Sequence, residues 1–337
     1  MTRWSLLVAS LCLAASPVAA QESSDDDTAR RTAYEACLLE ALARAPPDAS
    51  VSALRTLCNP DAQTQRERNE YALRGRLALE EVSRLNPFVL TPHRRNYLLP
   101  FSYWSNPVSN NPLIDDEELQ HQEIKFQVSL KAPLLSDFWN GYTAYFSFTA
   151  VSWMQIYNQG LSRPFRETNY EPELFVVRPV DWQFGPIDSE LLSFGYWHQS
   201  NGRDVPTSRS WDRLFVSYVF RTGSWYVAVK PWWRIPENGN YPDTSPKRDD
   251  NPDIERYLGH FDLNIIRPMG NHVFELHWRN NLRRDDNKGS AQIDYSFPIN
   301  SRFKGLFQAF TGYGDSLINY DNYENRFSIG ILLTDTF

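Results

Sequence analysis

The sequence has few cysteines and lacks long apolar runs. Beyond the N-terminus, no segment reaches the roughly 18 consecutive apolar residues that a membrane-spanning helix needs. Cys12 lies in the first 20 residues, so Cys37 and Cys58 remain, too few for a disulfide framework. No His/Cys cluster has zinc-ligand spacing, and the net charge is -7 with no basic stripe. These absences argue against a helical membrane protein, a zinc domain and a nucleic-acid-binding domain.

Aromatic residues are abundant in a chain that is otherwise hydrophilic. Phe, Trp and Tyr make up 14% of the 337 residues, with 11 Trp, although the mean hydropathy is -0.52. This combination is unusual for a soluble enzyme. It is typical of a transmembrane β-barrel, in which apolar residues occupy every second strand position and aromatic residues form girdles at both membrane interfaces.

The N-terminus has the pattern of a secretory signal peptide. Arg3 provides the positive charge, residues 6–15 form a short apolar stretch, and residues 18–20 form a small-residue cleavage site. The apolar stretch is too short to span a bilayer as a helix, which disfavours a membrane anchor. We therefore expect residues 1–20 to be removed on export, so that the mature chain begins at Gln21.

Residues 21–85 are polar and contain two helical patterns, 28–45 and 63–84, each of which ends before prolines. After export, Cys37 and Cys58 would meet an oxidising compartment, which is compatible with one disulfide between the first helix and the connector. We expect a helical periplasmic extension here. Two interpretations stay open: a small plug or docking element, or an extension with no catalytic part.

From about residue 95, apolar and polar residues alternate with a period of two. Ile124, Phe126, Val128 and Leu130 form one such apolar row. One apolar and one largely polar face is the pattern of a membrane-barrel strand. We expect twelve strands, an even number as in single-chain bacterial barrels, at about residues 96–104, 122–132, 142–153, 172–178, 189–200, 211–221, 224–234, 256–266, 271–281, 289–297, 302–311 and 325–337.

A β-sandwich would show similar alternation, but two features favour a closed barrel. The expected strands are close to the about 9–11 residues that a tilted bilayer crossing needs. The last strand is expected to reach Phe337, with apolar residues on one parity, where it can pair with the first. The sequence thus predicts an all-β fold for residues 86–337, a twelve-stranded antiparallel transmembrane β-barrel.

Two neighbouring strands carry polar residues at the end of apolar rows. His198 and Ser200 end one row, and Asp212 begins the row on the next strand. The remaining residues of these rows mark the lipid side: Leu192, Phe194 and Tyr196 in the first strand, and Leu214, Val216, Tyr218 and Phe220 in the second. Residues i and i+2 of a strand project the same way, with Cα atoms about 6–7 Å apart. All three residues are therefore expected near one rim, facing lipid.

These three residue types can form a hydrolytic triad. A serine hydroxyl becomes a good nucleophile when a base takes its proton, and histidine suits that role near neutral pH. Asp212 could accept the other imidazole N–H of His198 and hold its tautomer. Polar groups beside lipid are costly for structure alone, but they suit an enzyme with a lipid substrate. The alternative is that His198 and Ser200 are ordinary residues where a strand leaves the membrane.

Several long motifs resemble those of the outer-membrane phospholipase A family, a calcium-dependent, dimerising group of lipases. The segment WHQSNGRDVPTSRSWDRLF (197–215) resembles the family's active-site segment. The resemblance covers about residues 86–337 and leaves residues 21–85 unmatched. Further matching motifs are RNYLLPFSYW (95–104), SRPFRETNYEPELF (162–175), DDNPDIERYLGH (249–260), GYGDSLINYD (312–321) and the terminal TDTF.

The resemblance implies a role for each site residue. It implies Ser200 as nucleophile, His198 as base and Asp212 as the residue that orients His198. The backbone N–H of Gly202 would be an oxyanion donor, since glycine allows close approach. Calcium, a hard cation that prefers oxygen ligands, would be bound by the Arg203 carbonyl and Ser208 of one subunit and by Ser162 of the other.

Three positions depart from the family pattern. Asp212 stands where the family usually has Asn, although hydrolase triads on other folds use Asp. The family commonly reads Ser-Asp before the proline of the active-site loop, and this chain has Asp204 and Val205. The acid has moved by one position, which puts a calcium role for it in question. Ala150 replaces a lipid-facing Gln that stabilises the family's dimer, so the strength of the dimer is open.

The resemblance implies a calcium-dependent hydrolase in the bacterial outer membrane. It would cleave acyl esters of phospholipids and lysophospholipids, as a phospholipase A1 or A2, and would be active as a homodimer because each subunit completes the other's calcium site. Two rivals remain: a porin-like channel without catalysis, and a soluble secreted serine esterase. Neither explains why His198 and Ser200 share the lipid-side parity.

Overall fold

The computed structural model divides into two compact units, residues 1–63 and 64–337. It describes residues 39, 73, 76, 90–112, 114, 119–160, 164–237, 239–242, 245, 248–300 and 303–335. The expected signal peptide, both remaining cysteines and Ser162 lie outside these residues. In the first unit, Leu39 is helical and exposed. Among the described residues, no helix is both long enough and apolar enough to span a membrane.

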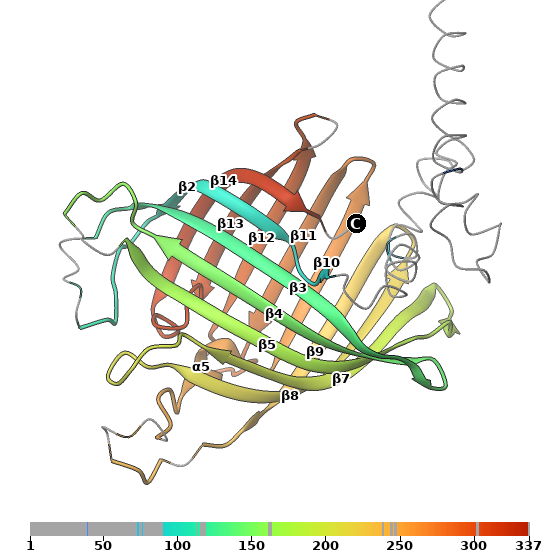
Figure 1. The fold of residues 1–337 in the computed structure, drawn as a ribbon, viewed down its shortest axis with the longest axis horizontal. Coiled ribbons are helices and arrows are strands. Elements are labelled where there is room, and N and C mark those ends of the chain that lie inside the picture. The colour runs from blue at the N-terminus through green and yellow to red at the C-terminus, as the bar shows by residue number, and fades with distance from the viewer. Residues whose placement is uncertain are drawn as a thin grey trace, which may run out of the picture. The chain divides into compact units, whose positions relative to one another are not determined.

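Twelve antiparallel strands of the second unit close into a barrel (Figure 1). Closure is completed by the pairing of β14 with β2 and of β3 with β4. Two short strands, β1 (Thr91–Pro92) and β6 (Gln183–Phe184), add to β3 and β7. The twelve barrel strands are β2 (Asn96–Trp104), β3 (Gln122–Trp139), β4 (Tyr142–Met154), β5 (Phe165–Pro179), β7 (Ile187–Ser200), β8 (Ser210–Thr222), β9 (Trp225–Ile235), β10 (Phe261–Met269), β11 (His272–Asn280), β12 (Gly289–Pro298), β13 (Lys304–Tyr313) and β14 (Tyr323–Thr334).

The expected fold class and strand number are confirmed, but one strand was placed wrongly at its start. Residues 256–258 belong to helix α5 (Ile254–Leu258) and not to a strand. Ile254 and Leu258, one helical turn apart, are both buried. The sequence could not reveal this because an apolar pair in a short segment fits both periods.

Other strand ends also differ from expectation. β5 begins at Phe165, seven residues before the expected 172, because Glu167 and Asn169 are buried on its inner face. The last strand ends at Thr334, short of the expected Phe337. Asp335 instead pairs with Lys304 at 2.7 Å. The polar inner face of β5 hides its first residues from a search for apolar runs. β3 runs to Trp139, seven residues beyond the expected 132, and its residues 134–139 are exposed.

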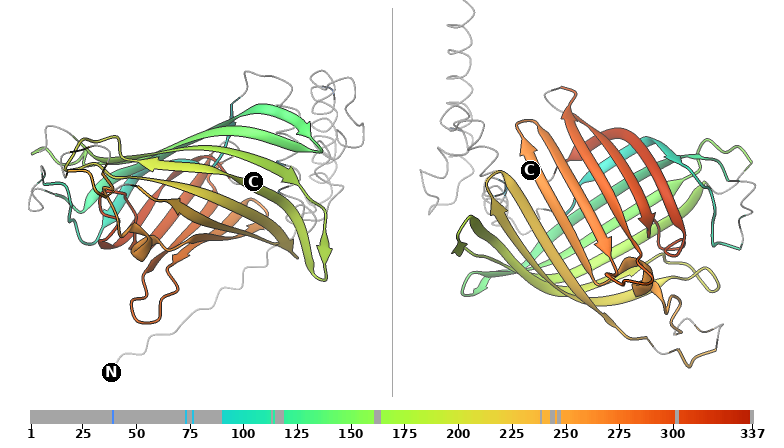
Figure 2. Two further views of the ribbon diagram at one scale, coloured as in Figure 1. Left: turned by 90° about the horizontal axis from the view of Figure 1, so that it is seen from below. Right: turned by 180° about the vertical axis from the view of Figure 1, so that it is seen from behind.

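The two ends of the barrel differ in their connections (Figure 2). One end has tight turns, in which Gly141 and Gly270 adopt the positive φ values that L-residues rarely take. The other end has long loops, including residues 201–209 between β7 and β8 and residues 236–260, which contain α5. In outer-membrane barrels the short turns are periplasmic and the longer loops are extracellular. The loop end is therefore the extracellular end.

The two faces of the barrel wall have opposite chemistry. Outward residues such as Phe101 (66% exposed) and Leu214 (51%) are apolar, whereas inward residues such as Arg213 and Glu123 are fully buried. Apolar side chains on the outside are favourable when the surrounding solvent is lipid. This pattern confirms the transmembrane barrel and excludes the sandwich.

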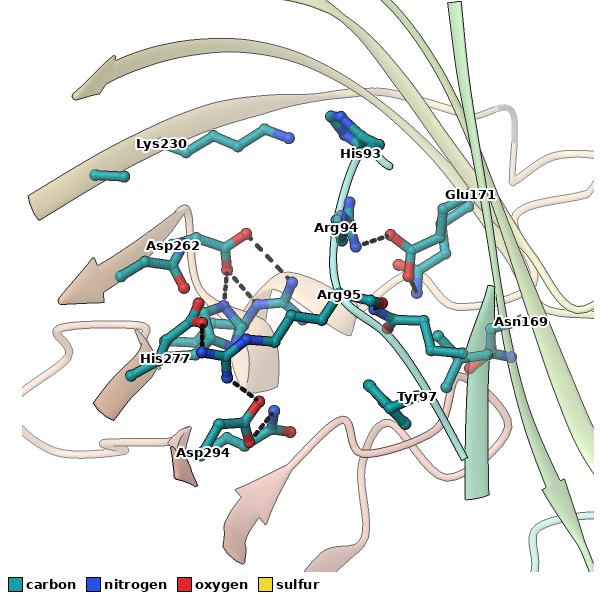
Figure 3. Close-up of a pocket in the computed structure, with 18 of the residues that line it drawn as sticks. His93, Arg94, Arg95, Tyr97, Asn169, Glu171, Lys230, Asp262, His277 and Asp294 are labelled. Carbon is teal, nitrogen blue, oxygen red and sulfur yellow. Dashed lines mark hydrogen bonds and ion pairs between the residues drawn. The ribbon is translucent and has the colours of Figure 1, made fainter. Parts of the chain in front are cut away.

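Ion pairs fill the interior near the loop end. Glu123 accepts from Arg166 and Arg326, each at 3.1 Å, and Asp315 pairs with Arg326 at 2.7 Å and Lys125 at 3.0 Å. Further along, a cavity of about 480 Å³ is lined by more such pairs (Figure 3). They include Arg94 with Glu171 (2.7 Å), Arg95 with Asp294 (3.2 Å) and His277 with Asp262 (2.9 Å).

The tight-turn end holds two residues that the sequence assigned to the extension. The backbone N–H of Leu73 donates to the Tyr226 hydroxyl at 3.3 Å, and Arg76 Nη2 donates to the Pro92 carbonyl at 2.9 Å. Leu73 is buried in one cluster with Tyr226 and Val273. These two residues lie at the starts of β9 and β11, directly after tight turns. Leu73 and Arg76, both helical, therefore dock onto the barrel.

Candidate functional site

Strands β7 and β8 bring His198 and Asp212 face to face. The two residues are direct register partners. His198 Nδ1 lies 2.7 Å from Asp212 Oδ1, and both side chains are about a third exposed, at 31% and 29%. Their outward neighbours Phe194 and Leu214 are exposed and apolar. The alternation of β7 and β8 thus places one polar pair on an otherwise apolar wall, as the sequence predicted.

Ser200 continues the same outward row at the last position of β7. It lies two residues beyond His198 and pairs in register with Ser210 on β8 and Tyr170 on β5. Within the described contacts, no hydrogen bond joins the Ser200 hydroxyl to His198. Such catalytic hydrogen bonds often tighten only when substrate is bound. The arrangement can therefore supply a nucleophile, a base and an acceptor that orients the base, all on the lipid side.

Buried aromatic residues support the site from inside the barrel. Trp197 and Trp211 lie on the inner faces of β7 and β8, and the Arg213 guanidinium stacks over their rings at 3.4 and 3.6 Å from the centroids. Leu317 of the β13–β14 loop joins the same core. This packing leaves the strands little freedom, so the outward side chains are held on a rigid wall.

One buried side chain organises the loop after Ser200. Asn201 Oδ1 accepts from the backbone N–H of Arg209 at 3.0 Å, and Asn201 Nδ2 donates to the Thr207 carbonyl at 2.8 Å. Gly202 has φ +63°, and a Cβ there would lie 3.1 Å from the Tyr170 ring. Any other residue at this turn would therefore be strained. Sequence reasoning identified Gly202 but missed Asn201, which only the folded loop reveals as an organiser.

The loop presents oxygen atoms of the type that calcium prefers. The Arg203 side chain is anchored to β5, with Nη2 donating to the Arg166 carbonyl at 2.6 Å. The Ser208 hydroxyl donates to the Asp250 carboxylate. Among the described residues, no group of three or more His, Cys, Asp or Glu could hold a metal. The expected ligands are instead carbonyl and hydroxyl oxygens with a carboxylate close by, which suits a hard cation.

Acidic residues of the β9–α5 connection lie near the same loop. Burial, with the charge of Asp249 next in size, raises the pKa of the Glu237 carboxyl to about 7. Asp212 and Asp250 contribute in the same direction, while Arg234 opposes them. Negative charge therefore accumulates beside Ser208. The sequence analysis missed this set because residues 237 and 249–250 are distant from the active-site segment along the chain.

Tyr196 is a further site residue that the sequence analysis placed only in an apolar row. Its hydroxyl donates to Asp212 Oδ1, the oxygen that also contacts His198 Nδ1. The sequence could have indicated this residue, because Tyr196 precedes His198 by two positions and therefore shares its outward face. Ala150, one of the family departures, lies on β4 in register with Tyr170.

Fold and site together define a transmembrane β-barrel whose wall carries a cluster of polar residues on its outer side. The chain belongs to the phospholipase A1 family, because that family's model matches residues 73–333. A Phospholipase A1 of Proteus vulgaris is 37% identical over 290 residues, covering 83% of this chain and 94% of that protein. A Phospholipase A1 of Escherichia coli K12 is 37% identical over 261 residues, with coverages of 75% and 84%.

Solved structures agree with this assignment and confirm the resemblance seen in the motifs. Outer membrane phospholipase A from Escherichia coli superposes with a TM-score of 0.67 at 35% identity, covering 74% of this chain and 100% of that one. A calcium-bound dimer of the Salmonella typhi outer membrane phospholipase also has a TM-score of 0.67, at 36% identity, with coverages of 75% and 94%.

Proposed function

We propose that the protein is an outer-membrane phospholipase that hydrolyses acyl esters of phospholipids and lysophospholipids. The observation that carries the proposal is the pair of His198 Nδ1 and Asp212 Oδ1, 2.7 Å apart on the lipid-facing wall beside Ser200. Family membership supports the phospholipid substrate. The position at the loop end directs the site toward the outer leaflet.

The residues then have distinct chemical roles. Asp212 accepts from Nδ1 of His198, which leaves Nε2 unprotonated and able to take the proton of Ser200 Oγ. Ser200 Oγ attacks the acyl carbonyl and forms an ester with the protein, while Nε2 returns the proton to the departing alcohol. Water, activated by the same nitrogen, hydrolyses this ester and restores the serine.

The charge that develops on the carbonyl oxygen needs donors close to the nucleophile. The Gly202 backbone N–H is well placed in sequence and conformation, because the turn exposes the backbone right after Ser200 and Asn201. The oxygens of Arg203 and Ser208 would hold calcium, with Ser162 of a second subunit. When bound, calcium supplies positive charge that stabilises an oxyanion. A homologue crystallised as a calcium-bound dimer supports this part of the proposal.

We further propose that the active form is a homodimer in the outer membrane after cleavage of residues 1–20. The outward faces of β7 and β8 carry exposed apolar residues such as Phe194 and Leu214, so two barrels can pack through these residues within the bilayer. A subunit that lacks its partner would lack one calcium ligand. Activity should therefore rise with protein concentration in detergent micelles.

The test is phospholipid hydrolysis by the purified protein in detergent, with and without calcium, for the wild type and Ser200→Ala. We expect Ser200→Ala to lose about 10³-fold or more in kcat, since removal of the nucleophile abolishes the covalent route. A fluorophosphonate probe should label the wild type and not the variant. Ser210→Ala, on the neighbouring strand position, is the matched control and should retain activity. Undiminished hydrolysis by Ser200→Ala would refute the proposed function.

A further inference from the structure

Tyr196, His198 and Asp212 form a three-membered contact on the outer wall. Tyr196 and His198 lie on successive outward positions of β7, and Asp212 lies opposite on β8. The Tyr196 hydroxyl and His198 Nδ1 both contact the same carboxylate oxygen, Asp212 Oδ1. The Tyr196 side chain is 38% exposed among apolar neighbours. Its hydroxyl is therefore aimed back along the wall at the acid rather than toward the lipid.

The acid has few other partners to hold it. Among the described residues, the one ion pair of Asp212 is with His198. A carboxylate at the membrane edge loses hydration, which raises the free energy of its charged form. Without a further partner, its side chain would turn toward water. A phenol can lower that free energy with a charge-assisted hydrogen bond, which is stronger than a neutral one. Unlike an arginine, it does so without neutralising the charge that His198 needs.

We propose that Tyr196 is a positioning residue that acts on the reaction through Asp212. This inference rests on the proposed function. The Tyr196 hydroxyl fixes the carboxylate rotamer that receives His198 Nδ1. It also shares the negative charge, so that the acid stabilises the protonated imidazole less strongly than an unshared carboxylate would. The chain thus compensates for an acid at a position where its family resemblance leads one to expect Asn.

The first test is Tyr196→Phe, which removes one hydroxyl and keeps the ring. We expect kcat to fall about fivefold with KM unchanged, since a hydrogen bond to a charged group is lost but the lipid contacts remain. The acid limb of the kcat/KM profile should move to higher pH, because the unshared carboxylate favours protonated His198. A loss of rate without movement of this limb would show a merely structural role and overturn the inference.

A double-mutant cycle makes the route through Asp212 explicit. In an Asp212→Ala background, Tyr196→Phe should cause no further loss, because the group on which it acts is gone. If the rate losses of the two single variants instead multiplied in the double variant, the inference would be contradicted. The matched control is Tyr323→Phe on the distant strand β14. It removes another exposed hydroxyl, which lies 2.8 Å from Thr311 Oγ1 on β13, and should leave both rate and pH profile unchanged.

The two proposals fail in different ways. If Ser200→Ala abolishes hydrolysis and labelling while Tyr196→Phe behaves like the wild type at every pH, the inference is wrong and the proposed function stands. If Ser200→Ala stays active, the proposed function fails, and the inference fails with it. Heat-modifiable migration on gels should show a folded barrel for every variant, so that a rate change is not mistaken for loss of folding.

Discussion

Charged residues inside the barrel and on its outer wall differ in their exposure and in the partners that balance their charge. Inside, Glu123 is fully buried and contacts both Arg166 and Arg326, which in turn contacts Asp315. Outside, Asp212 is 29% exposed and has one imidazole and one phenol as partners. A fully buried charge needs several partners because water is excluded, whereas a charge at the membrane edge keeps some hydration.

This difference distinguishes charges that stabilise the fold from charges proposed to act in hydrolysis. The interior network joins strands through fully buried charges that compensate one another. The outer pair contributes little to holding the strands, which are already joined by backbone hydrogen bonds. The proposed role of this pair in hydrolysing a lipid ester would account for its cost on an apolar wall. Variants should therefore affect stability in one region and rate in the other.

The largest effect is expected from breaking the interior network. Glu123→Ala leaves two buried guanidinium groups without their shared acid, so the free energy of unfolding should fall by about 3–5 kcal/mol. Denaturant titration of the barrel in detergent measures this. The rate per folded molecule should not change. Asp212→Ala is the control from the outer wall and should change the free energy of unfolding by less than about 0.5 kcal/mol. A decrease as large as that of Glu123→Ala would show that the two regions do not differ in their contribution to stability.

Removal of calcium should lower the rate and weaken the dimer without unfolding the barrel. We expect excess EDTA to lower kcat by about a hundredfold or more, the cost of losing an oxyanion contact, and to shift dimer to monomer. Added calcium should restore both, and the barrel should remain folded throughout. Ser208→Ala should need more calcium for half-maximal activity, because one oxygen ligand is lost. Full hydrolysis in EDTA would contradict the calcium assignment.

Truncations of the N-terminal segment should distinguish its two parts. Deleting residues 21–63 keeps Leu73 and Arg76, so stability and activity should match the full chain. Deleting residues 21–85 also removes the buried Leu73, and stability should fall by about 2–3 kcal/mol with hydrolysis still measurable. Leu73→Ala in the full chain is the matched point variant. Loss of folding after the shorter deletion would show that the extension is itself a structural plug.

The smallest effect is expected from Asp212→Asn. Asn keeps an acceptor for His198 Nδ1, so we expect less than about a tenfold loss, or 1.4 kcal/mol of barrier. Asp212→Ala should lose more, because no acceptor remains to hold the ring. Rates at several pH values for both variants decide this. If the two losses are equally mild, Asp212 does not orient His198, and Ser200 and His198 act alone.

Much of the architecture was available from local pattern. Alternation of apolar and polar residues gave nine of the twelve strands to within about three residues at each end, and parity put His198, Ser200 and Asp212 on the lipid side. The pattern failed for the other three strands. An inner polar face disguised the start of β5 at Phe165, an apolar pair formed the helix Ile254–Leu258, and β3 continued to Trp139 through residues that are exposed and do not alternate.

By itself, the sequence determined the barrel and the outward direction of His198, Ser200 and Asp212, because strand periodicity is a local property and lipid selects one face. It could not determine which atoms meet across β7 and β8, since register depends on the pairing of whole strands. Only the tertiary structure placed the Tyr196 hydroxyl on Asp212, Asp250 beside Ser208, and Leu73 against Tyr226. These contacts join residues that are 16, 42 and 153 positions apart in the sequence, so no pattern among neighbouring residues predicts them.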